Sequence, residues 1–150
     1  MMGHALKILI VEDHLLIARQ LDMIVTAAGH HVVGTALNAA QACTLAESTR
    51  PDIVFLDINL AGGASGLDVA GVIAETCQAY VIFTTANRRR LPPDCCGAVG
   101  VVEKPFTRAG LVSALHFVVS RINESEATVA APHSLLLSPL FEARWQAGNR

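Results

Sequence analysis

The chain has 150 residues, 11 basic and 13 acidic groups, and an apolar fraction of 52%. These values favour one globular domain with a substantial core and exclude a disordered chain. A net charge of −2 provides no general basic field, which argues against DNA as a partner. The sequence shows no signal peptide, and no apolar run approaches the ~18 residues that span a bilayer, so we expect a cytoplasmic protein without a membrane partner.

Short apolar runs alternate with segments of helical periodicity. The run KILIV at 7–11 predicts a buried strand, and apolar residues spaced by three and four over 14–28 predict a helix after it. The alternation continues with strands predicted at 31–36, 53–57, 79–85 and 99–104, and helices at 38–49, 66–77 and 107–122. Strands that are apolar throughout indicate a parallel sheet covered on both sides. We therefore predict an α/β fold with a doubly wound five-stranded sheet in the order 2-1-3-4-5.

The segment between the fourth and fifth predicted strands is short and contains Pro92 and Pro93, which bar a regular helix there. The fourth helix is therefore expected to be reduced to a turn or two, or lost. Arg88, Arg89 and Arg90 lie in the same segment. They form either a solvated loop or a site where one guanidinium contacts phosphate or an acidic partner.

Residues 123–150 form a tail after a predicted domain at 1–122, and they are too few for a DNA-binding output domain. The stretch SPLFEARWQAG predicts a short amphipathic helix, because Pro139 suits a first turn and Phe141 and Trp145 are four residues apart. Three uses of this helix stay open: packing on its own domain, exchange within a homodimer, and binding to another protein.

Polar groups end four of the five predicted strands: Glu12 with Asp13, Asp57, Thr85 and Lys104. The carboxyl ends of neighbouring parallel strands meet at one edge of a sheet, so we expect these groups to share a pocket. Three carboxylates in one pocket repel each other unless a cation joins them, and Mg²⁺ suits such oxygen ligands. Three carboxylates, one lysine and Mg²⁺ have charges that sum to zero, a balance suited to receiving a phosphoryl group.

Asp57 ends a fully apolar strand, and its carboxylate is the candidate nucleophile that accepts phosphate as an acyl phosphate. Metal and lysine would supply the alignment and charge neutralisation that phosphoryl transfer requires. Small residues beside the predicted site would let backbone approach the phosphate: Gly62, Gly63, Gly66 and Ala86.

Four segments resemble motifs of the receiver domains of two-component response regulators. ILIVEDH resembles the family's acidic pair, IVFLDIN its phospho-acceptor segment, IFTTA its hydroxyl switch and EKPF its lysine–proline signature. The resemblance covers residues 6–122.

The resemblance implies that Mg²⁺ is held by Glu12, Asp13, Asp57 and the backbone carbonyl of Asn59. It implies that Asp57 takes its phosphoryl group from a phosphohistidine, carried by a sensor histidine kinase or a histidine phosphotransferase.

Further roles follow from the same resemblance. Lys104 would pair with the phosphate, and Thr85 would turn to bind it. Asn59 and Asn87 would tune the removal of phosphate by water. The peptide before Pro105 is commonly cis in this family.

Three features depart from the family pattern: the shortened segment before the fifth predicted strand, described above, and the two that follow. Val101 stands where receivers usually have an aromatic residue three before the lysine, so the usual threonine–aromatic relay lacks its ring. The loop LAGGASG is one residue longer than the commonest form, and we expect it to be more mobile.

These observations predict a stand-alone receiver: a phosphoprotein of a two-component pathway or phosphorelay that signals through protein contacts. It would catalyse only its own phosphorylation and dephosphorylation and would not be an enzyme acting on a metabolite. One alternative is a receiver-like scaffold that dimerises without phosphorylation. Another is a phosphatase with an aspartyl nucleophile, which usually needs an acid two residues after the nucleophile, where this chain has Asn59.

Overall fold

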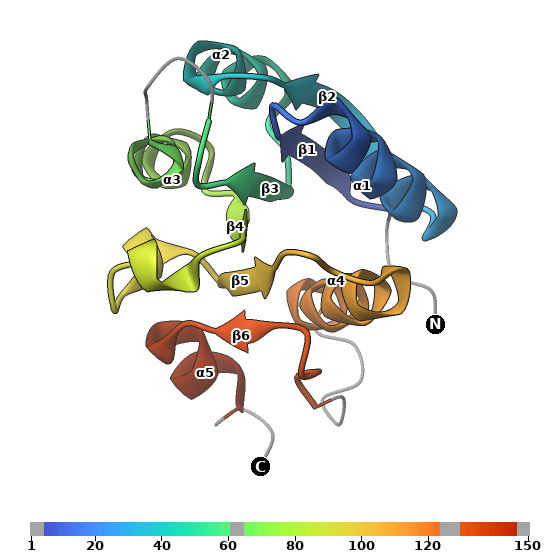
Figure 1. Ribbon diagram of the computed structural model, residues 1–150, viewed down its shortest axis with the longest axis vertical. Helices are drawn as coiled ribbons and strands as arrows, with labels where there is room; N and C mark the ends of the chain where they lie inside the picture. The colour runs from blue at the N-terminus through green and yellow to red at the C-terminus, as the bar shows by residue number, and fades with distance from the viewer. Residues whose placement is uncertain (1–4, 61–64, 124–129, 147–150) are drawn as a thin grey trace.

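The computed structural model describes residues 5–60, 65–123 and 130–146, which build a central sheet with helices on both faces (Figure 1). The strands are β1 (Lys7–Val11), β2 (His31–Ala36), β3 (Ile53–Asp57), β4 (Tyr80–Thr85), β5 (Gly100–Glu103) and β6 (Leu136–Leu137). The helices are α1 (Leu15–Ala27), α2 (Ala39–Thr49), α3 (Gly66–Cys77), α4 (Arg108–Ile122) and α5 (Pro139–Gln146), with 3-10 turns η1 (Arg88–Arg90) and η2 (Cys95–Gly97).

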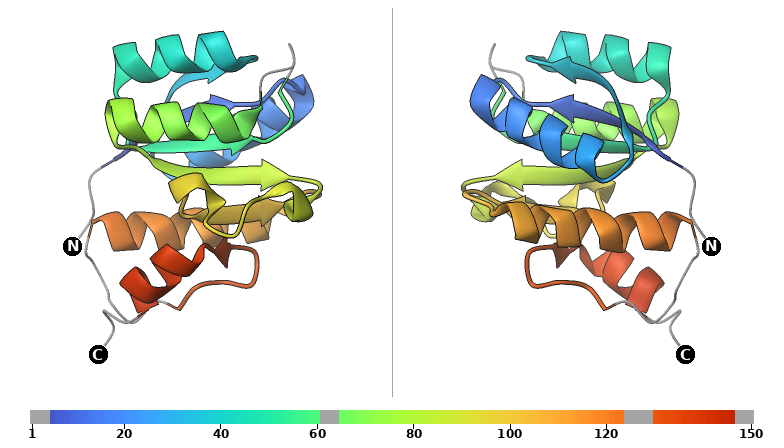
Figure 2. Two further views of the ribbon diagram at one scale, coloured as in Figure 1. Left: turned by 90° about the vertical axis from the view of Figure 1, so that its left-hand side faces the viewer. Right: turned by 90° about the vertical axis from the view of Figure 1, so that its right-hand side faces the viewer.

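The sheet has the order β2-β1-β3-β4-β5-β6. The first five strands are parallel, so the predicted order is confirmed for them. The expectation of five strands in all was wrong, because Leu136 and Leu137 of the tail pair antiparallel with Val101 and Gly100. Helices α1 and α4 cover one face, and α2 and α3 cover the other (Figures 1 and 2).

Burial explains why the strands could be recognised. All five residues of β3 are buried, as are the four of β1 after Lys7. Alternate side chains of these strands point to opposite faces of the sheet and pack in two separate hydrophobic cores. One core lies beneath α1 and α4, and the other lies beneath α2 and α3. Helices α2 and α4 begin with a capping side chain: those of Asn38 and Thr107 accept hydrogen bonds from backbone amides of the helices they begin.

The chain between β4 and β5 contains only the two 3-10 turns η1 and η2, as the prolines predicted. Pro92 and Pro93 lie between the turns, and Cys95 and Cys96 adopt positive φ angles of 52° and 51°. This part of the chain therefore leaves β4 as a loop and not as a full helix.

The tail packs against its own domain. Trp145 and Phe141 are buried with ring centroids 4.8 Å apart, and Trp145 lies 5.9 Å from both Phe117 of α4 and Tyr80 of β4. The helix expected near 138–148 is α5, at the opposite end of the sheet from β2 (Figure 1).

Gly100 allows the tail strand to come this close. A Cβ atom at this position would lie 2.2 Å from the carbonyl oxygen of Leu136, well inside contact distance. Within the described parts of the chain, no helix combines the length and apolar content needed to cross a membrane.

Candidate functional site

An acidic cluster lies where β1 and β3 end. Glu12 and Asp13 follow β1, Asp57 is the last residue of β3, and one carboxylate oxygen of each lies within 4.8 Å of the others. Glu12 and Asp57 are only 1% and 5% exposed, whereas Asp13 is open to solvent. The sheet topology thus places these three predicted residues together.

Lys104 brings a positive charge into the cluster from the end of β5. Its Nζ lies 2.7 Å from Oε1 of Glu12 and 3.5 Å from Oδ2 of Asp57, and its side chain is 15% exposed. The backbone N–H of Lys104 donates to the carbonyl oxygen of Thr85, which ties the ends of β4 and β5 together. The peptide between Lys104 and Pro105 is cis.

The electrostatics of the cluster are those of a site short of positive charge. Burial, followed by the neighbouring Glu12, raises the pKa of Asp57 from its ordinary 3.8 to about 6. The backbone N–H of Asn59 and the charge of Lys104 oppose this rise without cancelling it. A divalent cation would complete the balance, and the converging carboxylate oxygens fit the hard, oxygen-preferring Mg²⁺.

The two oxygens of Glu12 already have partners. One accepts from Lys104 Nζ, and the other accepts from the backbone N–H of His14 at 3.1 Å. Asp13 and Asp57 are therefore better placed than Glu12 to contact a cation directly.

Two adjacent threonines end β4. Thr85 is buried, and its hydroxyl oxygen accepts from the backbone N–H of Asn87 at 3.0 Å. Thr84 is the register partner of Asp57 on β3, and its buried hydroxyl has no hydrogen-bond partner among the described residues. Sequence reasoning missed Thr84, although the pair of threonines was a visible signal. Ala86, which follows them, is exposed.

Asn59 connects the cluster with η1. Its backbone N–H donates to Oδ1 of Asp57 at 3.1 Å, and its side-chain oxygen accepts from the guanidinium of Arg90. At the other end of η1, Nε of Arg88 lies 3.9 Å from Oε2 of Glu103. The sequence marked the arginines as candidates for phosphate, but it gave no sign of this amide contact.

Of the glycines predicted beside the site, Gly66 has a different and clear role. A Cβ there would lie 2.2 Å from the carbonyl oxygen of Asp57, so α3 begins closely packed on the end of β3. Gly62 and Gly63, and the expectation of a mobile loop, lie outside the described residues.

Val101, at the position of the family's aromatic residue, is 4% exposed and contributes to the core beneath α2 and α3. It pairs with Phe83 on β4 and with Leu136 on β6. Its side chain has no ring to turn, and the strand that carries it is covered by the tail.

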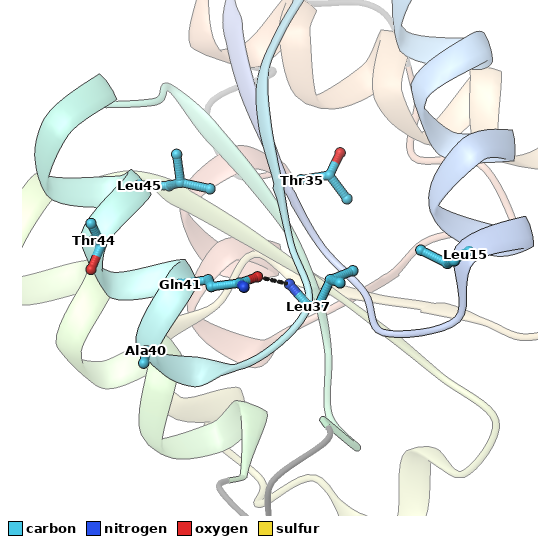
Figure 3. Close-up of a pocket in the computed structure, with 7 residues that line it drawn as sticks. All are labelled: Leu15, Thr35, Leu37, Ala40, Gln41, Thr44 and Leu45. Atoms are coloured by element: carbon cyan, nitrogen blue, oxygen red, sulfur yellow. Dashed lines mark hydrogen bonds between the residues drawn. The ribbon is translucent and has the colours of Figure 1, made fainter.

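Exposed apolar residues border the cluster. Leu15 and Leu16 begin α1, separated from the acidic pair only by His14, and are 67% and 75% exposed. Leu15 also contributes to an open depression of about 660 Å³ between α1, β2 and α2 (Figure 3). The other residues that line it are Thr35, Leu37, Ala40, Gln41, Thr44 and Leu45.

Comparison with known proteins gives a consistent answer. Residues 8–116 match the model of the response regulator receiver domain family. The phyllosphere-induced regulator PhyR of Methylorubrum extorquens is 39% identical over 109 residues, which cover 71% of this chain and 41% of that protein. The transcriptional regulatory protein PdtaR of Mycobacterium tuberculosis is 33% identical over 121 residues, covering 79% of this chain and 58% of that protein.

A solved structure agrees with these relatives. The solution structure of the Erythrobacter litoralis PhyR receiver domain has a TM-score of 0.71 at 31% identity, covering 81% of this chain and 95% of that one. The matches thus span about half the length of the curated relatives, 41% of PhyR and 58% of PdtaR.

Proposed function

The chain belongs to the response regulator receiver domain family, and from this premise we propose that it is a phosphoacceptor whose Asp57 takes a phosphoryl group from a phosphohistidine. The donor would be a sensor histidine kinase or a histidine phosphotransferase. The observation that carries the proposal is the meeting of Glu12, Asp13, Asp57 and Lys104 at one edge of the sheet.

The transfer is an in-line displacement at phosphorus. A carboxylate oxygen of Asp57 attacks, an O–P bond forms, the P–N bond to the donor imidazole breaks, and the departing imidazole takes up a proton. A carboxylate raised in pKa by burial and by Glu12 is a stronger nucleophile than an ordinary one. Glu12, whose Oε1 lies 2.7 Å from Lys104 Nζ, keeps the lysine directed into the site.

Mg²⁺, when bound, would neutralise the charge of the transferring phosphoryl group. Asp13 and Asp57 would hold it directly, together with the backbone carbonyl of Asn59, and Glu12 would act through water because both of its oxygens are engaged. Lys104 needs to move its ammonium only slightly from Glu12 toward Asp57 to meet a phosphoryl oxygen.

Thr85, the last residue of β4, would donate a hydrogen bond to the phosphoryl group, and Asn87 would support it. The hydroxyl of Thr85 accepts from Asn87 N–H, which leaves its own proton free to be donated to a phosphoryl oxygen. The exposed Ala86, which follows Thr85, adds little bulk beside the site.

The donor must dock where it can reach Asp57. Leu15 and Leu16 lie exposed beside the acidic pair, and apolar exposure of this kind is typical of protein contacts. We therefore propose that the donor docks on the surface around Leu15 and Leu16.

We also propose that the reaction takes place in the cytoplasm, where cysteine thiols stay reduced, because the four cysteines of this chain are free thiols.

The test is intact-mass measurement after incubation with acetyl phosphate and Mg²⁺. The wild-type chain should gain one phosphoryl group, and the Asp57→Asn variant should gain none. Asp52→Asn is the matched control, because Asp52 is also an aspartate beside β3 but lies at the opposite end of the strand. A wild-type chain that gains no mass would favour the scaffold alternative, to which the absent ring at Val101 lends support.

A further inference from the structure

The turn η1 is fastened to the candidate site at both of its ends. At its start, Asn87 donates its backbone N–H to the Thr85 hydroxyl and accepts from the N–H of Arg89 at 3.1 Å. At its end, the guanidinium of Arg90 donates to the side-chain oxygen of Asn59, whose own N–H binds Asp57. A change at Asp57 is thus two hydrogen bonds away from Arg90.

Charge makes Arg90 the candidate to respond. Asp57 carries one negative charge, whereas its acyl phosphate carries close to two, so the neutral balance with Mg²⁺ becomes negative. Arg88 already faces Glu103. Among the described residues Arg90 forms no ion pair, and its partner Asn59 is a neutral amide.

Geometry also favours a shift of this side chain. A guanidinium has five N–H donors in a planar fork that matches phosphate oxygens, and the contact with Asn59 occupies only part of it. Arg90 is exposed and lies on a turn of three residues, so little packing resists its movement.

We propose that Arg90 is the phosphoryl-sensing residue of this chain. On phosphorylation its guanidinium leaves the Asn59 side chain, binds phosphoryl oxygens on Asp57 and moves η1. The inference rests on the proposed function, because it requires the acyl phosphate. Movement of Arg90 would carry the effect of phosphorylation from Asp57 to η1 without an aromatic ring at Val101. The surface that changes on phosphorylation would then be that of η1.

The experiment compares Arg90→Gln with Arg89→Gln, a control in which the neighbouring exposed arginine of the same turn loses its charge. Amide signals of Asn87–Leu91 are followed by NMR in the full chain before and after addition of acetyl phosphate and Mg²⁺, and intact mass confirms phosphorylation. Wild type and Arg89→Gln should show shifts in this segment at least threefold larger than Arg90→Gln at equal phosphorylation. Arg90→Lys, which keeps charge but not the fork, should fall between them.

Equal shifts in Arg90→Gln and Arg89→Gln would overturn the inference and leave the proposed function intact. A phosphorylated wild-type chain with unmoved η1 signals would do the same. If wild type gains no phosphate, the proposed function fails, and the inference falls with it. Unchanged emission of Trp145 confirms that each variant is folded.

Discussion

Lys104 is closer to Glu12, at 2.7 Å, than to Asp57, at 3.5 Å. All three side chains are largely withdrawn from water, and Lys104 is the one cation that forms ion pairs with the two acids among the described residues. The lysine therefore stabilises the folded state in addition to its proposed role toward phosphate.

Removal of this cation should destabilise the domain. Lys104→Met leaves two buried carboxylates without their partner, and we expect the free energy of unfolding at pH 7.5 without metal to fall by about 2–3 kcal/mol. Urea titration measures this. A second change, Glu12→Gln, should restore part of the loss, because one of the unpaired charges is removed; additive losses in the double variant would contradict the pairing.

Asp57 gives the stability of the metal-free protein a defined pH dependence. Its pKa is about 6 in the folded protein against an ordinary 3.8, so the folded state binds the proton more tightly than the unfolded state does. Stability from this group is therefore lost as the pH rises from about 4 through 6. Asp57→Asn should gain up to about 3 kcal/mol over wild type at pH 7.5, because the pKa difference is roughly two units, and only about 0.5 kcal/mol at pH 4.

Mg²⁺ should remove that difference, because it binds the wild-type carboxylate and stabilises the folded state by mass action. Thermal unfolding with and without Mg²⁺ tests both statements. An Asp57→Asn variant less stable than wild type at every pH would show that the carboxylate is not under electrostatic strain.

Thr84 provides a stability test inside the sheet. Its buried hydroxyl lacks a hydrogen-bond partner among the described residues, and such a group costs roughly 1–3 kcal/mol. Thr84→Val, which keeps the shape of the side chain, should raise the free energy of unfolding by about 1 kcal/mol. Thr85→Val should lower it, because that hydroxyl accepts from Asn87 N–H. Equal effects of the two substitutions would mean that a water molecule satisfies Thr84.

Gly100 should control the docking of the tail. Gly100→Ala places a Cβ 2.2 Å from the Leu136 carbonyl oxygen, which must displace β6 and loosen α5. Trp145 is the only tryptophan and is 8% exposed, so its emission should shift to longer wavelength as the tail loosens. Gly71→Ala is the control: nothing lies within 4 Å of its Cβ, and in the middle of α3 it should stabilise by about 0.5–1 kcal/mol.

The sequence predicted the strands best where their side chains are fully buried. β1 and β3 lie between two helical layers, so their apolar runs were plain, and the charged residues that end them marked the edge where the site lies. Pro92 and Pro93 likewise indicated a chain without a full helix, because proline lacks the N–H that a helix requires.

Other features depend on contacts that no local pattern carries. β6 has only two residues, and its pairing with β5 relies on the absent side chain of Gly100. The position of Thr84 beside Asp57 depends on strand register, and the contact between Arg90 and Asn59 depends on how two loops approach in space. The roles of individual site residues toward metal and phosphate stay predictions.

β6 also has a consequence for self-association. A parallel strand at the rim of a sheet presents unpaired amides and carbonyls that invite a strand from another molecule. Here Gly100 and Val101 of β5 already pair with Leu137 and Leu136. The edge strand of the sheet on this side is therefore β6, which is only two residues long. Fibre-like growth through this rim is thereby discouraged, and truncation of the tail should make the protein aggregate more readily.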